Sequence, residues 1–279
     1  MAFSSIYKRR YLAAVVFAAA MTGCVWKHNK SKADFAEYSY PSMFGTAEIF
    51  TLKSESGALV RVLNVGGAFQ SATYLGKKRF EPVFEYYRAF DHMFDYSNNP
   101  KTILMIGGGG FSYPKHLLTS KSNASIDVVE SDPAIVNIAR KHFYLDELEQ
   151  KYGEDGKQRL NIYVADGLNF FNESHGKRYD VIINDAFDGA NPAVGLLTST
   201  ALNKAKQRLT SNGLYMLNAV ISAEDTDMLQ TYMEVLLEGF SNVYAIKCVE
   251  EEFAGEDNWL LIASDGQHRF DSITTMVTR

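Results

Sequence analysis

Residues 102–110 read TILMIGGGG, a continuous apolar run that leads directly into four glycines. Such a run is typical of a strand that is buried on both faces of a parallel sheet. Glycines at its end let the backbone approach a ligand closely and present amide groups from the start of the next helix. A turn with a positive φ angle explains one or two glycines, whereas four in succession favour a binding loop.

Similar apolar runs recur along the chain, and segments with helical spacing separate the earlier ones. Because strands alternate with helices, we predict an α/β fold with a doubly wound, Rossmann-like sheet. Right-handed crossovers place the ligand crevice of such a sheet at the carboxyl ends of its strands, so functional residues are expected just after each run. The further runs lie at 126–129, 160–164, 181–183, 214–217, 243–246 and 259–262, and the helical segments at 113–118, 133–142, 168–171 and 198–209.

A different pattern precedes this sheet. Residues 47–75 form short alternating runs separated by glycines, which predict two or three strands of a small antiparallel β-domain. Residues 81–96 have the apolar spacing of a helix that packs on the next domain. We therefore predict three parts: a signal or anchor segment with its linker at 1–32, a β-hairpin domain with a substrate helix at 40–96, and a nucleoside-binding domain at 97–279.

Acidic residues follow three of the predicted strands. Glu130 stands about 20 positions beyond the glycine run, where a carboxylate accepts hydrogen bonds from ribose hydroxyls. Asp166, followed by Gly167, is placed either to contact an adenine edge or to cap the next helix. Asp185 and Asp188 lie in the loop NDAFDG, and apolar burial does not account for two acids there. A role in a site is therefore the better interpretation of this pair.

The motif series GGGG, VESDP, ADG and NDAFDGANP, in this order and spacing, resembles the spermidine synthase (polyamine aminopropyltransferase) family. That family shares its core fold with class I methyltransferases that use S-adenosylmethionine. The stretches LNVGGAFQ and GEDNWLLIAS are similar to an early strand pair and the last strand of the family, so the resemblance covers roughly residues 46–264. It implies a transferase of polyamine biosynthesis whose co-substrate is S-adenosylmethionine or decarboxylated S-adenosylmethionine.

The resemblance also implies roles for individual residues. Asp185 would be the catalytic carboxylate, and Asp188 a second acid that binds the substrate. Glu130 would bind the ribose, and Asp166 beside Gly167 the adenine. The sulfur end of the nucleoside would meet Gln70 and the loop formed by Gly107, Gly108, Gly109 and Gly110.

The implied reaction makes a definite demand on Asp185. A primary amine has a pKa near 10.4, so forming the neutral nucleophile at pH 7 costs about 4.6 kcal/mol. A carboxylate that orients the amine and accepts its proton offsets this cost. The cationic sulfonium is already a good leaving group, so no metal is required, and the six histidines show no ligand spacing.

The chain departs from the family pattern at two places. The family carries an aspartate at the fourth position of the glycine motif, where this chain has Gly110. That aspartate is expected to bind the free amine of the decarboxylated donor and to repel the carboxylate of S-adenosylmethionine, so its loss predicts weaker selectivity between the two. Glu85, Tyr86 and Tyr87 replace the Tyr-His-Glu cluster of the family, and we expect Glu85 and Tyr86 to contact the substrate.

Three functions therefore stay open: an aminopropyltransferase-like enzyme acting on an amine, an S-adenosylmethionine-dependent methyltransferase with another acceptor, and a nucleoside-binding homologue without turnover. An NAD-linked oxidoreductase shares the glycine loop and the ribose acid, but it does not predict the acidic loop that holds Asp185. The net charge of −5 and the pI near 5.7 argue against a nucleic-acid partner. We expect a small-molecule amine as the partner and leave a homodimer open.

The first 32 residues have the pattern of a targeting segment. Lys8, Arg9 and Arg10 precede an apolar stretch over residues 11–21, and Cys24 follows two small residues. This is typical of a secretory signal, and its end resembles a bacterial lipobox in which Cys24 would carry the lipid. The alternative is an uncleaved signal anchor. In both cases we expect a membrane-associated protein, on a side of the membrane that the flanking charges do not select.

Overall fold

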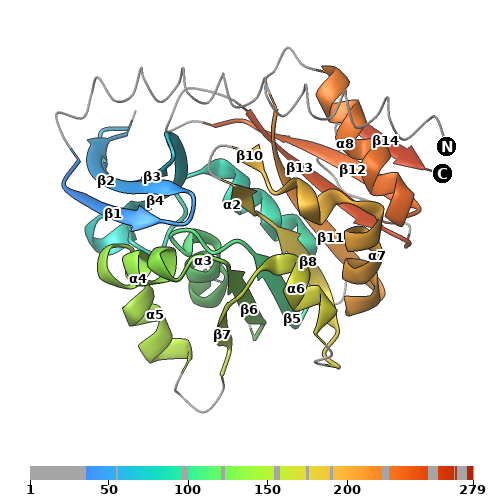
Figure 1. Ribbon diagram of the computed structural model, residues 1–279, viewed down its shortest axis with the longest axis horizontal. Helices are drawn as coiled ribbons and strands as arrows, with labels where there is room; N and C mark the ends of the chain where they lie inside the picture. Colours follow the sequence, from blue (N-terminus) through green and yellow to red (C-terminus); the bar gives the residue numbers. More distant parts are fainter. Residues whose placement is uncertain are drawn as a thin grey trace.

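The computed structural model describes residues 36–54, 56–95, 100–120, 123–153, 158–173, 176–188, 191–221, 226–250, 257–266, 268 and 275–278. A small antiparallel sheet and a large mixed sheet with helices on both faces organise this part of the chain (Figure 1). The predicted α/β class, a doubly wound sheet preceded by a small antiparallel sheet, is confirmed. The expected signal or anchor segment, with Cys24, lies outside the described residues, among which no helix has the length and apolarity needed to span a bilayer.

The small sheet has four strands rather than the two or three that the sequence predicts. The additional strand is the edge strand β1, whose sequence YSYPS does not alternate and is largely exposed. Proline is tolerated at such an edge, so Pro41 does not prevent pairing. The strands lie in chain order and pair antiparallel: β1 Tyr38–Ser42, β2 Gly45–Lys53, β3 Leu59–Val65 and β4 Ala68–Tyr74.

The large sheet has the order β14-β12-β13-β11-β8-β5-β6-β7. Five strands are mutually parallel: β5 Thr102–Ile106, β6 Ser125–Glu130, β7 Leu160–Val164, β8 Tyr179–Asn184 and β11 Leu209–Ile221. From β5 the chain proceeds outward through β6 and β7, and then returns to place β8 on the other side of β5. The loops after β5 and β8 therefore leave in opposite directions, and the carboxyl ends of these strands are where an open α/β sheet binds ligands.

The remaining strands extend the sheet antiparallel beyond β11. They are β12 Asn242–Cys248, β13 Asp257–Ser264 and β14 Thr275–Thr278. β13 pairs antiparallel with both β11 and β12, so β12 runs in the same direction as β11. The carboxyl end of β12 and the amino end of β13 consequently lie at the same edge of the sheet as the carboxyl ends of the parallel strands.

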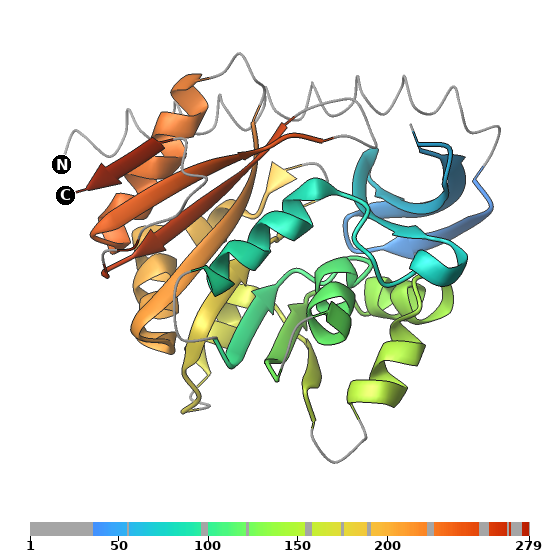
Figure 2. The same ribbon diagram turned by 180° about the vertical axis from the view of Figure 1, so that it is seen from behind.

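Two apolar cores cover the two faces of the large sheet. Alternate residues of β5 face opposite sides, with Ile103 in one core and Leu104 in the other. The first core includes Val62 and other residues of the small sheet, so the small sheet and the large sheet share one apolar interior. Residues of α3 Ser112–Ser120, α4 Pro133–His142 and α5 Leu145–Tyr152 join this first core, and those of α6 Gly167–Asn172, α7 Ser199–Arg208 and α8 Thr226–Gly239 join the second (Figure 2).

The helix predicted over residues 81–96 is shorter in the structure. α2 spans Glu85–Ala89 and continues as the 3-10 helix η2, Phe90–Phe94. The segment before α2 is extended because Pro82 bridges to Thr73 of β4. The other short elements are η1 Gly76–Lys78, η3 Val194–Leu197, β9 Phe187–Asp188 and β10 Asn191–Pro192.

A buried lysine joins the small sheet to the helices beneath it. The Lys115 ammonium on α3 is 1% exposed and donates to Thr73 Oγ1 and to the Phe143 carbonyl, each at 3.0 Å. Burial lowers the pKa of Lys115 from 10.5 to about 7, against a smaller opposing effect of the Glu147 charge. The amine therefore costs stability when it is protonated, although its hydrogen bonds are satisfied.

This shift predicts a specific pH dependence of stability. Between pH 7 and 10 the unfolded chain holds a proton on Lys115 that the folded protein lacks, so the free energy of unfolding should rise with pH. The increment is at most about 1.4 kcal/mol per pH unit. Lys115→Met should remove this increment in urea titrations across that range, whereas Lys101→Met at an exposed site should keep it. Parallel pH profiles for wild type and Lys115→Met would contradict the prediction.

Gly107 lets the loops after β5 and β8 touch. The Asp185 amide donates to the Ile106 carbonyl at 2.9 Å. A Cβ atom on Gly107 would lie 2.3 Å from the Asp185 carbonyl oxygen, and the φ angle of Gly107 is +94°. A side chain is therefore excluded both by the contact and by the backbone conformation.

Gly107→Ala should lower the free energy of unfolding by at least about 3 kcal/mol, from a left-handed backbone and an overpacked contact. Gly67→Ala is the matched control, because Gly67 has the same φ of +94° and nothing within 4 Å of a Cβ. The control should lose only the backbone contribution, about 1–2 kcal/mol. Equal losses for both variants in urea denaturation would show that the contact with Asp185 is unimportant.

Candidate functional site

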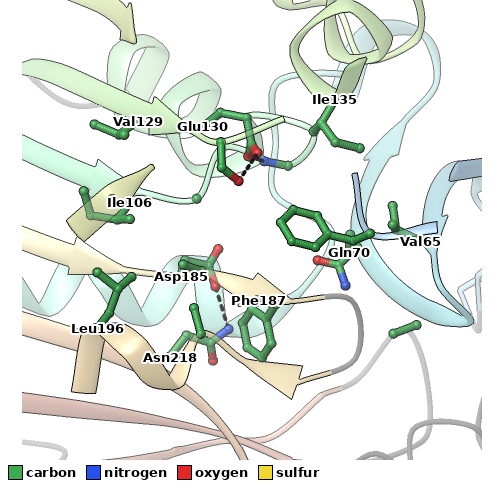
Figure 3. A pocket seen from close by; sticks show the side chains of 18 of the residues that line it. Val65, Gln70, Ile106, Val129, Glu130, Ile135, Asp185, Phe187, Leu196 and Asn218 are labelled. Atoms are coloured by element: carbon green, nitrogen blue, oxygen red, sulfur yellow. Dashed lines mark hydrogen bonds between the residues drawn. The ribbon is translucent and has the colours of Figure 1, made fainter. Parts of the chain in front are cut away.

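A cavity of about 600 Å³ lies at the carboxyl edge of the large sheet, closed on one side by the small sheet and α2. Figure 3 shows how residues from separate elements converge on it, with Gln70 from β4, Glu130 from β6 and Asp185 after β8. Residues that were predicted because they directly follow a strand, such as Glu130 at the end of β6 and Asp185 after β8, therefore lie together in the cavity. Of the predicted residues, the cavity is lined by Gln70, Tyr86, Gly107, Gly109, Glu130, Asp166, Gly167 and Asp185.

The Glu130 carboxylate organises the glycine loop. Its Oε2 accepts hydrogen bonds from the amides of Gly108 at 2.8 Å and Gly109 at 3.3 Å. Its Oε1 accepts from the Asp132 amide at 2.9 Å. The loop amides that could bind an anionic ligand therefore already donate hydrogen bonds to the buried Glu130 carboxylate. Each oxygen can accept more than one hydrogen bond, so the carboxylate can still receive ribose hydroxyls.

The four glycines serve different purposes. Gly107 and Gly109 line the cavity, whereas Gly108 and Gly110 do not. A Cβ on Gly108 would lie 2.9 Å from the Phe111 ring. A Cβ on Gly110 would lie 2.6 Å from Ser71 Oγ and 2.9 Å from Phe143 Cδ1. The space at position 110 is thus filled by two neighbouring side chains, and an aspartate does not fit there without rearrangement.

Asp166 and Gly167 combine structural and site positions. Asp166 Oδ1 accepts from the Asn169 amide at 2.8 Å and so caps α6, and Asp166 also lines the cavity. A Cβ on Gly167 would lie 2.6 Å from Ile106 Cγ2. The glycine is therefore required for the close packing of α6 on β5, in addition to any approach by a ligand.

Asp185 lines the cavity directly after the carboxyl end of β8. Its Oδ1 accepts a hydrogen bond from Asn218 Nδ2 at 2.7 Å, and Tyr86 is a second hydrogen-bond partner. Burial raises the pKa of Asp185 to about 7; the two hydrogen bonds oppose this rise, and the Glu130 charge adds to it. A carboxyl group with this pKa can exchange a proton with a substrate near neutral pH.

Tyr86 lines the cavity next to Asp185, whereas Glu85 does not line it. The Glu85 carboxylate lies 3.5 Å from Arg88 Nε on the same helix. The acid that reaches the cavity from this region is Glu250, whose Oε2 accepts from the Glu85 amide at 3.1 Å. Burial raises the pKa of the Tyr86 hydroxyl, and the charges of Asp185 and Glu250 raise it further. Both carboxylates are therefore electrostatic neighbours of Tyr86.

The second predicted acid, Asp188, lies in β9, which pairs with β10 next to the cavity wall formed by Phe187. Its side chain is outside the described part of the chain. In the ranges that the structure covers, no three histidine, cysteine or acidic residues gather as a metal site would require.

Sequence reasoning did not find several polar residues that line the cavity, among them Asn218, Glu250 and Asn258. Glu250 follows the apolar run at 243–246, so the expectation that functional residues lie just after each strand, applied to β12, would have indicated it. Asn218 lies inside β11, and Asn258 lies at the start of β13, which runs in the opposite direction. A rule based on the residues after each strand cannot indicate positions of these two kinds.

The sequence and the structure both match proteins of known type. At the sequence level the chain is 28% identical to a polyamine aminopropyltransferase of Thermoanaerobacter sp. over 187 residues, 67% of this chain and 61% of that protein. It is 32% identical to a polyamine aminopropyltransferase of Vibrio vulnificus over 157 residues, 56% of this chain and 49% of that protein. The matched region thus spans about half to three fifths of these relatives.

The structure is similar to that of a spermidine synthase from Thermotoga maritima, with a TM-score of 0.62, 20% identity, and coverage of 84% of this chain and 73% of that one. A spermidine synthase in complex with the transition-state analogue AdoDATO gives a TM-score of 0.65 at 21% identity, with coverage of 84% and 75%. These two likenesses show the fold. The spermine/spermidine synthase domain model matches residues 84–252, well over half of the chain, which contain the glycine loop, Glu130, Asp185 and Glu250. The chain belongs to the spermine/spermidine synthase family.

Proposed function

We propose that this protein transfers an aminopropyl or related group from a sulfonium nucleoside, S-adenosylmethionine or its decarboxylated form, to an amine, with Asp185 as the general base. The observation that carries the proposal is the placement of the Asp185 carboxylate, with a pKa of about 7, in the same cavity as the glycine loop held by Glu130. Family membership and homology to polyamine aminopropyltransferases support the same reaction class.

The donor half of the cavity favours a sulfonium nucleoside over a dinucleotide. The amides of Gly108 and Gly109 already donate to the Glu130 carboxylate. A pyrophosphate at this loop would face that anion at close range, which is unfavourable. A ribose can donate its hydroxyls to the same carboxylate, and a sulfonium cation is attracted to it. Glu130 thus supports a cationic nucleoside and argues against NAD.

The acceptor half suits a cationic amine. Asp185 and Glu250 both line the cavity with Tyr86, and the charge of each raises the pKa of the Tyr86 hydroxyl. Phe84 and Tyr87 add aromatic walls to the same part of the cavity. Carboxylates bind the ammonium groups of an amine, and aromatic faces attract the cation and its methylene chain.

The chemistry is a displacement at a carbon bound to sulfur. The amine nitrogen forms a bond to this carbon, the C–S bond breaks, and its electron pair returns to sulfur to give a neutral thioether. The nitrogen gains a positive charge and loses a proton, which Asp185 accepts. Because the pKa of Asp185 is raised to about 7, the carboxylate is a stronger base than an ordinary aspartate, and roughly half of it is ionised at pH 7.

Methyl transfer from S-adenosylmethionine is the second candidate, and position 110 favours it. Ser71 and Phe143 occupy the space where the family carries an aspartate. No side chain at this position repels a carboxylate on the donor, so S-adenosylmethionine itself is not rejected on charge there. We therefore propose relaxed selectivity between the two donors at this end of the cavity.

Asp185→Asn should reduce turnover of putrescine by about 10²–10⁴-fold, because it removes the general base, while binding of methylthioadenosine persists. In the wild type, kcat should fall about tenfold per pH unit below pH 7, since protonated Asp185 cannot accept a proton. The control is Asp146→Asn, an exposed aspartate on α5. Full turnover in Asp185→Asn would overturn the assignment, and turnover that requires S-adenosylmethionine with an acceptor other than putrescine would favour the methyltransferase.

Glu130→Gln should weaken binding of methylthioadenosine by about 10- to 100-fold, because a carboxylate that accepts several hydrogen bonds is replaced by an amide with one acceptor oxygen. Isothermal calorimetry with methylthioadenosine, S-adenosylmethionine, decarboxylated S-adenosylmethionine and NAD measures this effect. Glu173→Gln, on the surface after α6, is the control. Tighter binding of NAD than of methylthioadenosine by the wild type would contradict the proposal.

A further inference from the structure

Two asparagine side chains form a hydrogen-bonded chain that ends on Asp185. Asn258 Nδ2 donates to Asn218 Oδ1 at 2.7 Å, and Asn218 Nδ2 donates to Asp185 Oδ1, also at 2.7 Å. All three side chains line the cavity. Figure 3 shows the Asn218 amide directed at one oxygen of Asp185, with the other carboxylate oxygen pointing away from Asn218.

The sheet itself places the three residues together. β8, β11 and β13 are neighbours, and Asp185 directly follows β8. Asn218 pairs with Leu260, and Asn258 pairs with Val220, in the antiparallel register of β11 and β13. Asn218 and Asn258 are therefore diagonal partners on adjacent strands, a separation that amide side chains can bridge. The arrangement depends on strand register and not on a flexible loop.

We propose that Asn218 and Asn258 are positioning residues that determine which oxygen of Asp185 receives the proton from the amine, an inference that rests on the proposed function of this site. A side-chain amide can rotate by half a turn and exchange its oxygen and nitrogen with little change of shape. Asn258 prevents this exchange, because its donated hydrogen bond holds the oxygen of Asn218 toward β13. The NH₂ group of Asn218 must then point at Asp185 Oδ1.

This orientation has a chemical consequence. An oxygen that accepts a hydrogen bond from an amide is the less basic oxygen of the carboxylate, so the proton goes to Oδ2. A reversed amide would present a carbonyl oxygen to Asp185 Oδ1, which favours a proton on Oδ1 and away from the substrate. Among the described residues, the other ionisable groups acting on Asp185 are Tyr86 and Tyr87 of α2 and Glu130 of β6, and Glu250 acts on Tyr86. None of these fixes the orientation of the Asn218 amide.

A double-mutant cycle on the titration of Asp185 tests the proposal without requiring turnover. The full chain is labelled with ¹³C at the aspartate carboxyl groups, and the Asp185 signal, assigned with Asp185→Asn, is followed by NMR as a function of pH. Asn218→Leu should raise the apparent pKa of Asp185 by about one unit, because a hydrogen bond to the carboxylate is lost. Asn258→Leu should raise it less in the wild-type background and not at all in the Asn218→Leu background.

Asn161→Leu is the matched control, because Asn161 donates the same kind of hydrogen bond to the carboxylate of Asp127, and neither residue lines the cavity. It should leave the titration of Asp185 unchanged. If either leucine variant does not fold, Asn218→Ala and Asn258→Ala replace the pair. An unchanged Asp185 titration in Asn218→Leu, or an equal effect of Asn258→Leu in both backgrounds, would overturn the proposed positioning role of the two asparagines.

The failure of this positioning role and the failure of the proposed function are distinguishable. If the apparent pKa of Asp185 changes in the variants as expected but no amine is alkylated by either donor, the positioning role of the asparagines stands and the proposed function is wrong. If transfer to an amine requires Asp185 but the apparent pKa of Asp185 does not change in Asn218→Leu, the proposed function stands and the positioning role of the asparagines is wrong. Where both hold, the acidic limb of the kcat profile should move with the NMR titration in each variant.

Discussion

The buried carboxylate of Glu130 is the interaction on which the site depends. It accepts hydrogen bonds from the glycine loop after β5 and from the Asp132 amide at the start of α4. Asp132 in turn caps α4 by accepting from Ala134, and its other oxygen accepts from the Met43 amide in the turn between β1 and β2. The side chains of Glu130 and Asp132 thus connect the large sheet, its first crossover helices and the small sheet around a single cavity.

Much of the fold was predictable because the inner parallel strands are buried on both faces, and the partly exposed edge strand β7 is still a mainly apolar run. The runs at 102–106 and 160–164 and the helix at 133–142 agree with the structure at both ends. Elements whose stability comes from tertiary contacts were not predictable in this way. The edge strand β1 is mostly exposed and has no alternating pattern, and α5 is a short helix held by packing on α3 and α4.

The site was predictable to the extent that its residues follow parallel strands. Glu130 and Asp185 meet in the cavity for that reason, whereas Glu85 was expected there from its place in the family pattern and instead lies next to Arg88. The asparagines that contact Asp185 and each other belong to strands whose relative register is a property of the folded sheet. The packing of Ser71 and Phe143 at Gly110 likewise joins segments distant in the sequence, so a glycine there could be noticed but not explained.

The absence of a side chain at Gly107 also bears on how such a protein can diverge. Gly107 lets the loop after β5 lie against the backbone of Asp185. This contact and the hydrogen bond from the Asp185 amide to the Ile106 carbonyl fix the main chain at Asp185. Asp185, the proposed base, is therefore located by main-chain atoms, which substitution of neighbouring side chains leaves in place. The cavity wall formed by Tyr86, Phe187 and Glu250 can consequently change over evolutionary time, and under the proposed function a new acceptor can be explored around an Asp185 that stays where it is.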